Sequence, residues 1–170
     1  SRARFILLKS GTMWSDFMSK AKDSWGSWDI PGREEIYDFI EENRIGGVQL
    51  LSGDRHGARG FRIDRPSGFA LYEFEAATLG GVPGPGAFAP DKSAQLFGYR
   101  GGLKAFGEFT FDFGRKDPEV THSLALRACN SNESGAAQLS DRLHGVVGID
   151  IWSIESLQLS TVIRSSFLEV

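Results

Sequence analysis

The chain has 170 residues, of which 41% are hydrophobic and 24% are charged, and its formal net charge at pH 7 is −3. This length suffices for one hydrophobic core and is short for two, and the balanced charge gives no electrostatic case for nucleic acid or an anionic membrane as a partner. The single cysteine, Cys129, excludes an internal disulfide and leaves the redox compartment open.

The first residues predict a strand, Arg4–Leu8, with no lead-in before it. Its apolar run ends at Lys9 and is far shorter than the roughly 20 residues that a bilayer crossing needs. We therefore expect neither a membrane span nor a signal peptide in this chain. An opening of this kind is typical of a sequence that starts inside a domain.

A polar segment with scattered aromatic residues follows, from Ser10 to Ile30. Its rings are Trp14, Phe17, Trp25 and Trp28. Aromatic residues at uneven spacing in a loop indicate that the rings pack the loop onto the core, because each ring buries a large apolar area. Contact with a ligand is the alternative interpretation.

The next segment predicts a helix over Gly32–Arg44 that leads directly into a strand. Its apolar residues form one stripe, and its acidic residues occupy the opposite, solvated face. Residues 45–47, Ile-Gly-Gly, end the helix, since glycine adopts the left-handed conformation of a C-cap. The apolar run Val48–Leu51 then predicts a buried strand, so that helix and strand together indicate an α/β layer.

The turn-rich stretch after this strand carries the candidate chemistry. Asp54 and His56 are two residues apart, and an extended backbone would point both side chains to one side and Arg55 to the other. Carboxylate oxygen and imidazole nitrogen together suit zinc, iron, manganese or nickel. The alternative is a hydrogen-bonded pair in a surface loop.

Two arginines in the same stretch, Arg55 and Arg59, are candidates for phosphate binding. The planar guanidinium fork matches phosphate oxygens, and the small residues Gly57, Ala58 and Gly60 allow a ligand or another backbone to approach closely. The alternative for both arginines is a plain surface charge.

Two hairpins are expected in the second half of the chain. Phe61–Ile63 and Phe69–Ala76 predict strands joined by a turn, and Phe106–Phe113 and Val120–Leu126 predict a second pair with one aromatic face. The Gly- and Pro-rich residues 78–90 between them predict a long loop.

Two kinds of polar residue in this half, glutamate and histidine, are considered as site residues. Glu73 and Glu75 share one face of their strand and are expected to be solvent-exposed, with a role behind the site as the alternative. His122 and His144 are expected to be structural. Residues 129–170 form a tail for which the sequence gives no assignment.

These segments resemble the carboxyl-terminal part of the PhoD-like alkaline phosphatases, a branch of the calcineurin-like metallophosphoesterases. The resemblance is carried by residues 45–60, together with 23–25, 32–35 and 68–74. It implies an α/β (α+β) fold, a partial αββα sandwich with a mixed sheet, flanking helices and a C-terminal β-hairpin. Residues 1–128 would be the carboxyl-terminal part of the phosphatase domain, and 129–170 an unassigned tail.

The resemblance also implies site residues. In that family a Ser-Gly-Asp-x-His element, here Ser52–His56, carries the last pair of metal ligands, which makes Asp54 and His56 the metal-binding and catalytic candidates. Divalent or mixed metal ions, iron with calcium by family precedent, would bind there. Arg59, Arg55 and Asp23 are the candidate substrate-binding residues.

The implied function is metal-dependent hydrolysis of a phosphoester, by a phosphomonoesterase or a phosphodiesterase, with a small-molecule, lipid or nucleotide-type substrate. The superfamily takes its first ligands from Asp-x-His, Gly-Asp and Gly-Asn-His segments, which this chain lacks. We therefore expect the chain to need the N-terminal part of the domain and to be inactive alone, and the family suggests an exported protein. The alternative is a non-catalytic, β-rich binding or structural domain.

Overall fold

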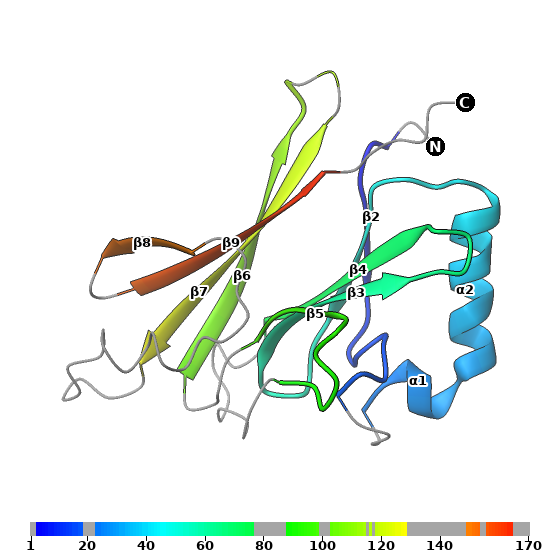
Figure 1. Ribbon diagram of the computed structural model, residues 1–170, viewed down its shortest axis with the longest axis horizontal. Helices are drawn as coiled ribbons and strands as arrows, with labels where there is room; N and C mark the ends of the chain where they lie inside the picture. Colours follow the sequence, from blue (N-terminus) through cyan, green and yellow to red (C-terminus); the bar gives the residue numbers. More distant parts are fainter. Residues whose placement is uncertain are drawn as a thin grey trace.

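The computed structural model describes residues 3–18, 23–76, 88–98, 103–114, 116, 118–128, 149–153 and 156–164. Two sheets lie face to face, and a helix covers the outer face of the first (Figure 1). The elements are β1 Ile6–Lys9, α1 Trp25–Trp28, α2 Ile30–Glu42, β2 Val48–Ser52, β3 Ala58–Asp64, β4 Ala70–Ala76, β5 Gln95–Gly98, β6 Leu103–Asp112, β7 Glu119–Ala128, β8 Ile149–Ser153 and β9 Ser156–Arg164.

The first sheet has five strands in the order β1-β2-β4-β3-β5 and is mixed. Strands β1, β2 and β4 run parallel, whereas β3 is antiparallel to both β4 and β5. Helix α2 makes the crossover from β1 to β2, which is the usual way to connect neighbouring parallel strands. The structure confirms the expected mixture of α and β elements around a mixed sheet, and it confirms the predicted buried strand at Val48–Leu51 and the hairpin of β3 and β4.

Helix α2 begins two residues before the predicted position. Asp29 caps it, since its side chain accepts a hydrogen bond from the Gly32 N–H at 3.0 Å, and Pro31 fits the first turn, where a helix needs no N–H donor. The chain leaves the helix through Arg44, whose φ of 49° is left-handed. The predicted glycine C-cap is therefore wrong, because Asn43 is the C-cap and Arg44 takes the left-handed conformation after it; Gly47, with φ of 71°, lies directly before β2 instead.

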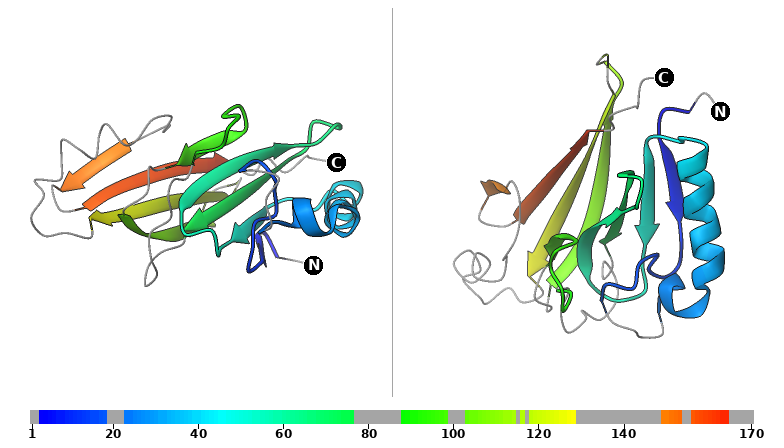
Figure 2. Two further views of the ribbon diagram at one scale, coloured as in Figure 1. Left: turned by 90° about the horizontal axis from the view of Figure 1, so that it is seen from below. Right: turned by 45° about the vertical axis from the view of Figure 1, so that its right-hand side comes forward.

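The helix packs on one face of the first sheet and forms a core with it. Tyr37 and Ile40 of α2 meet Leu50 of β2 and Leu71 of β4, and Trp14 closes this core from the loop after β1. Figure 2 shows α2 lying along β1 and β2. The aromatic loop packs inward as predicted, with Trp14 only 5% exposed, except that Trp28 is 62% exposed.

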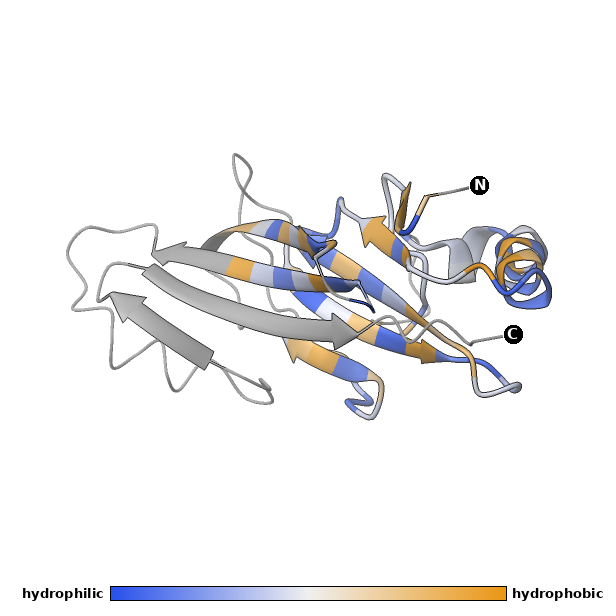
Figure 3. Ribbon diagram, turned by 90° about the horizontal axis from the view of Figure 1, so that it is seen from above, coloured by the Kyte–Doolittle hydropathy of each residue, from blue (hydrophilic) through white to orange (hydrophobic). Residues whose placement is uncertain are grey.

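The second sheet, in the order β6-β7-β9-β8, covers the opposite face of the first sheet. Strands β6 and β7 pair along their whole length, which confirms the second predicted hairpin. Strands β8 and β9 lie within the unassigned tail and extend this sheet. The core between the sheets is lined by Ala58, Phe74, Phe97, Ala105, Val120 and Leu124. Along the strands that Figure 3 draws in colour, bands of apolar and polar residues alternate.

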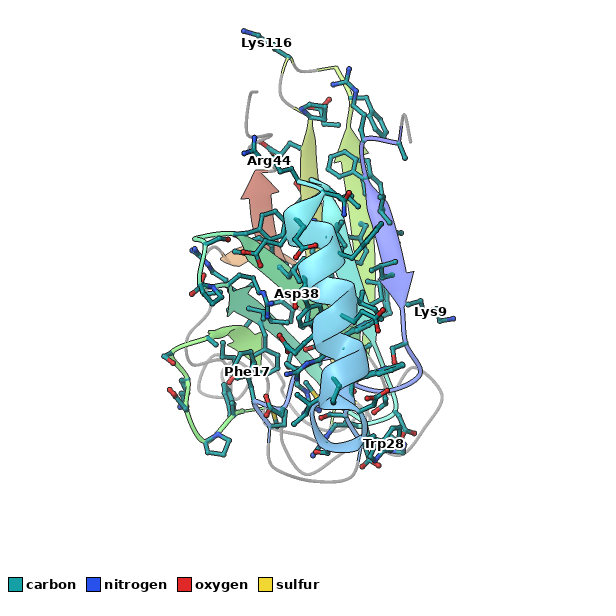
Figure 4. All side chains as sticks on the ribbon, turned by 90° about the vertical axis from the view of Figure 1, so that its right-hand side faces the viewer. Lys9, Phe17, Trp28, Asp38, Arg44 and Lys116 are labelled. Carbon is teal, nitrogen blue, oxygen red and sulfur yellow. The ribbon has the colours of Figure 1, made fainter. Side chains whose placement is uncertain are left out.

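The turn between β3 and β4 is tied to α2 by Arg65. Its guanidinium forms ion pairs with Glu34 at 2.5 Å, Asp38 at 2.5 Å and Glu41 at 3.1 Å, and it lies over the Tyr37 ring at 5.5 Å. Figure 4 shows Asp38 on this helix. The acidic face of α2 was expected to be solvated, but three of its carboxylates serve to hold the hairpin.

Several sequence expectations fall outside the described residues. Cys129, His144 and most of the predicted loop at 78–90 belong to this group. In the part of the chain that the structure describes, no helix has both the length and the apolar character of a membrane span.

Candidate functional site

The carboxyl ends of the parallel strands β1, β2 and β4 meet at one edge of the first sheet, and two loops cover that edge. One loop follows β1 and the other, residues 53–57, follows β2. The loop after β1 is tied to the end of β2, because the carbonyl of Leu51 accepts hydrogen bonds from the Ser10 N–H at 2.9 Å and from the Trp14 indole at 3.1 Å. In Figure 4, β1 runs downward from the end of the molecule marked by Arg44 to Lys9, which lies at about the height of Asp38. Ligand sites of α/β sheets form at such an edge.

Asp54 and His56 lie in the loop after β2, and both are exposed. Their φ angles are 70° and 49°, so the backbone is left-handed at both residues. The expectation that an extended backbone points both side chains to one side is therefore wrong. Residues other than glycine rarely have this left-handed backbone conformation, and residues held in it are enriched at functional sites.

A buried ion pair lies directly beneath this loop. Glu75 of β4 is 0% exposed, Arg59 of β3 is 1% exposed, and Arg59 Nε lies 2.7 Å from Glu75 Oε2. The two residues face each other across the antiparallel strands. Arg59 was predicted to bind phosphate, but the structure places its guanidinium inside the protein against a carboxylate.

The pair holds the backbone of Arg55 from both sides. Glu75 Oε1 accepts a hydrogen bond from the Arg55 N–H at 3.0 Å, and Arg59 Nη2 donates to the Arg55 carbonyl at 3.1 Å. The Arg55 side chain is half-buried, and its Nη1 is a buried donor without a hydrogen-bond partner among the described residues. Arg55 thus remains close to both candidate ligands.

Burial raises the pKa of Glu75 to about 7, because a carboxylate loses hydration inside the protein. The Arg59 charge and the Arg55 N–H act in the opposite direction, and the nearby Glu73 carboxyl adds to the increase. Desolvation outweighs the ion pair, so the carboxyl gains a proton near neutral pH.

Glu73 of β4 holds the loop that follows β1 in the same way. Its carboxylate accepts hydrogen bonds from the N–H groups of Trp14 at 2.8 Å and Ser15 at 3.0 Å, and from the Ser15 hydroxyl. Glu73 and Glu75 are both 0% exposed, so the expectation that they face solvent is wrong. The structure explains this burial through the parallel pairing of β4 with β2, since parallel strands are usually covered on both faces, and that pairing has no local signal in the sequence.

Asp23 lies beside the loop that follows β1. Its carbonyl accepts a hydrogen bond from the Met13 N–H at 3.3 Å, and the residue is half-buried. Within the described contacts, none joins Asp23 to Asp54 or His56. The structure therefore brings together Asp54, Arg55, His56 and Arg59 but does not link Asp23 to them.

The described residues contain no cluster of three or more His, Cys, Asp or Glu side chains arranged to hold a metal ion. Comparisons of the chain with models of protein families, with curated proteins and with solved structures found no match. The interpretation of the site accordingly depends on its own residues.

Proposed function

We propose that the chain is the carboxyl-terminal portion of a metal-dependent phosphoester hydrolase of the PhoD-like class, in which Asp54 and His56 supply two of the metal ligands. One observation carries this proposal: the two residues are exposed on a left-handed loop at the end of a central parallel strand, held from below by a buried ion pair. Residues held in a left-handed conformation by the surrounding structure are enriched at functional sites, which supports this proposal.

The donor set fits a metal ion. A carboxylate oxygen and an imidazole nitrogen suit iron or zinc, and an exposed pair leaves room for water and substrate. When bound, the metal supplies a Lewis acid that activates water and offsets charge on phosphoryl oxygens. Catalytic sites commonly use three protein ligands, so the proposal includes further ligands from outside these 170 residues.

The proposal assigns the phosphate contact to Arg55. Arg55 lies between the two candidate ligands in sequence and is half-buried, whereas the guanidinium of Arg59 is 1% exposed and committed to Glu75. The substrate class, a phosphomonoester or phosphodiester, and an exported location follow from the family resemblance.

One observation favours the second candidate, a non-catalytic β-rich domain that binds a partner. The described residues offer only two potential ligands on this loop and no cluster of three. In that case Asp54 and His56 would be a surface pair without a metal.

The deciding experiment compares variants of the full-length gene product. We expect Asp54→Asn and His56→Ala to abolish hydrolysis of an aryl phosphate and to reduce bound metal, measured by elemental analysis. Asp64→Asn is the matched control, because Asp64 is an exposed acid whose side chain is 70% accessible. Full activity and full metal content in both variants would refute the proposal. Metal-dependent hydrolysis by the 170-residue chain alone would refute its assignment as an incomplete catalytic domain.

A further inference from the structure

The buried pair of Glu75 and Arg59 touches the loop at a position with a specific geometric consequence. The Arg55 N–H belongs to the peptide unit that joins Asp54 to Arg55, and the Arg55 carbonyl belongs to the unit that joins Arg55 to His56. Glu75 holds the first unit and Arg59 holds the second. Because peptide units are planar, fixing these two sets φ and ψ of Arg55, and with them the relative orientation of the peptide units that carry Asp54 and His56.

The residues on either side of Arg55 have left-handed φ angles of 70° and 49°. For a residue other than glycine this conformation costs up to about 1–2 kcal/mol, so contacts that hold the adjoining peptide units favour it over the other conformations of the loop. Charge-assisted hydrogen bonds in a buried environment are strong enough to offset that cost. The supporting acceptor, Glu75 Oε1, comes from β4 and the supporting donor, Arg59 Nη2, comes from β3, and these strands are paired in the sheet.

Gly57 shows how closely the loop fits the pair. A Cβ added at Gly57 would overlap Nη2 of Arg59 and lie 2.8 Å from its Cζ. The loop backbone therefore packs directly on the guanidinium, and only glycine permits this approach.

We infer that Glu75 and Arg59 are positioning residues that set the angle between the Asp54 and His56 side chains and so prepare both for one ligand. Neither residue touches that ligand, since both are buried beneath the loop. The inference rests on the proposed function for the nature of the ligand, a divalent cation, but the positioning itself is a property of the folded chain.

The test uses the 170-residue chain and two readouts. The first is amide hydrogen exchange at Arg55, and the second is the change of the His56 imidazole NMR signals during a Zn²⁺ titration. The main variant is the double substitution Glu75→Leu with Arg59→Met, because replacing both members by apolar residues avoids leaving one charge buried alone. Glu75→Gln is the conservative variant, since its amide oxygen still accepts from the Arg55 N–H. Asp64→Asn serves as the control on β3.

We expect the double variant to exchange the Arg55 amide about tenfold or more faster than the unsubstituted chain, since the loop opens locally. Its Zn²⁺ affinity should fall about 10- to 100-fold, as is usual when a group that orients a ligand is lost. Glu75→Gln should retain part of both properties, and Asp64→Asn should retain both fully.

The two proposals fail in different ways. If the double variant is folded and exchanges the Arg55 amide at the unsubstituted rate, the positioning role is refuted. If the double variant does not fold, Glu75→Gln and Gly57→Ala decide, and unchanged exchange in both refutes that role. If the unsubstituted chain shows no Zn²⁺ effect on His56 while the exchange differences appear, the positioning role stands and the metal assignment of the proposed function fails.

Discussion

At the scale of single residues, two buried titratable groups respond to pH in opposite directions. His122 is 1% exposed and stacks on Phe74 at 4.3 Å and on Phe97 at 5.5 Å. Burial lowers its pKa to about 4, which makes it a neutral packing ring, in agreement with the structural role expected from the sequence. Glu75 differs, because burial raises its pKa to about 7.

The effect of His122 can be isolated by substitution. Between pH 6.5 and 4 the unfolded chain binds more protons at this residue than the folded chain, so its contribution to stability is complete above 6.5 and is lost as the pH falls toward 4. We expect His122→Phe to remove about 2–3 kcal/mol of this dependence, measured by urea unfolding at several pH values. Because the phenylalanine ring is larger than imidazole, the substitution also changes the free energy of unfolding, but by the same amount at every pH, so the slope is unaffected. An unchanged slope in His122→Phe would contradict the assignment.

The contribution of Glu75 to stability changes with pH in the opposite direction. Its folded pKa is raised, so its contribution is complete below about pH 4.5 and is lost as the pH rises toward 7. Glu75→Gln cannot titrate, and we expect its unfolding free energy to rise more steeply with pH between 4.5 and 7 than that of the unsubstituted chain. The difference should be on the order of 3 kcal/mol, because the pKa rises from 4.5 to about 7 and each pKa unit corresponds to about 1.4 kcal/mol. Parallel curves for the two proteins would show that the ion pair keeps this carboxyl charged.

At the scale of elements, the approach of β1 to β2 depends on Gly47. Its φ is 71°, and an added Cβ would overlap the carbonyl oxygen of Arg4. Gly68 has a φ of 89° but open space around it, so it is a matched control for the backbone angle alone. We expect Gly68→Ala to lose about 1 kcal/mol and Gly47→Ala about 3 kcal/mol in chemical unfolding. Equal losses would mean that contact with Arg4 does not matter.

The elements that sequence predicted are those whose pattern is local. Helix α2 and strands β2 and β4 follow from apolar spacing within each segment, and that spacing is fixed by the pitch of a helix or the pleat of a strand. The burial of Glu73 and Glu75 was missed because it depends on what covers β4. The backbone at Asp54 was missed for the same reason, since the group that holds Arg55 lies 20 residues away in sequence.

At the scale of the whole molecule, the two sheets share one core, and this makes a prediction about cooperativity. Leu124 of β7 is 0% exposed in the layer between the sheets, in one cluster with Phe74 of the first sheet. Residues of the two sheets are buried against each other in this layer. Loss of packing at Leu124 should therefore destabilise both sheets. The candidate site belongs to the first sheet, so its stability is linked to a strand that carries none of its residues.

We expect Leu124→Ala to lower the free energy of unfolding by about 2–5 kcal/mol, the usual range for a leucine truncated in a core. Hydrogen exchange at the backbone of β2 and of β7 should speed up together, since both sheets would open in one step. Phe113→Ala is the control, because Phe113 is 61% exposed and its loss should change stability far less. Faster exchange confined to β6 and β7 would show instead that the sheets unfold separately, in which case the loop that holds Asp54 and His56 would be stable without the second sheet.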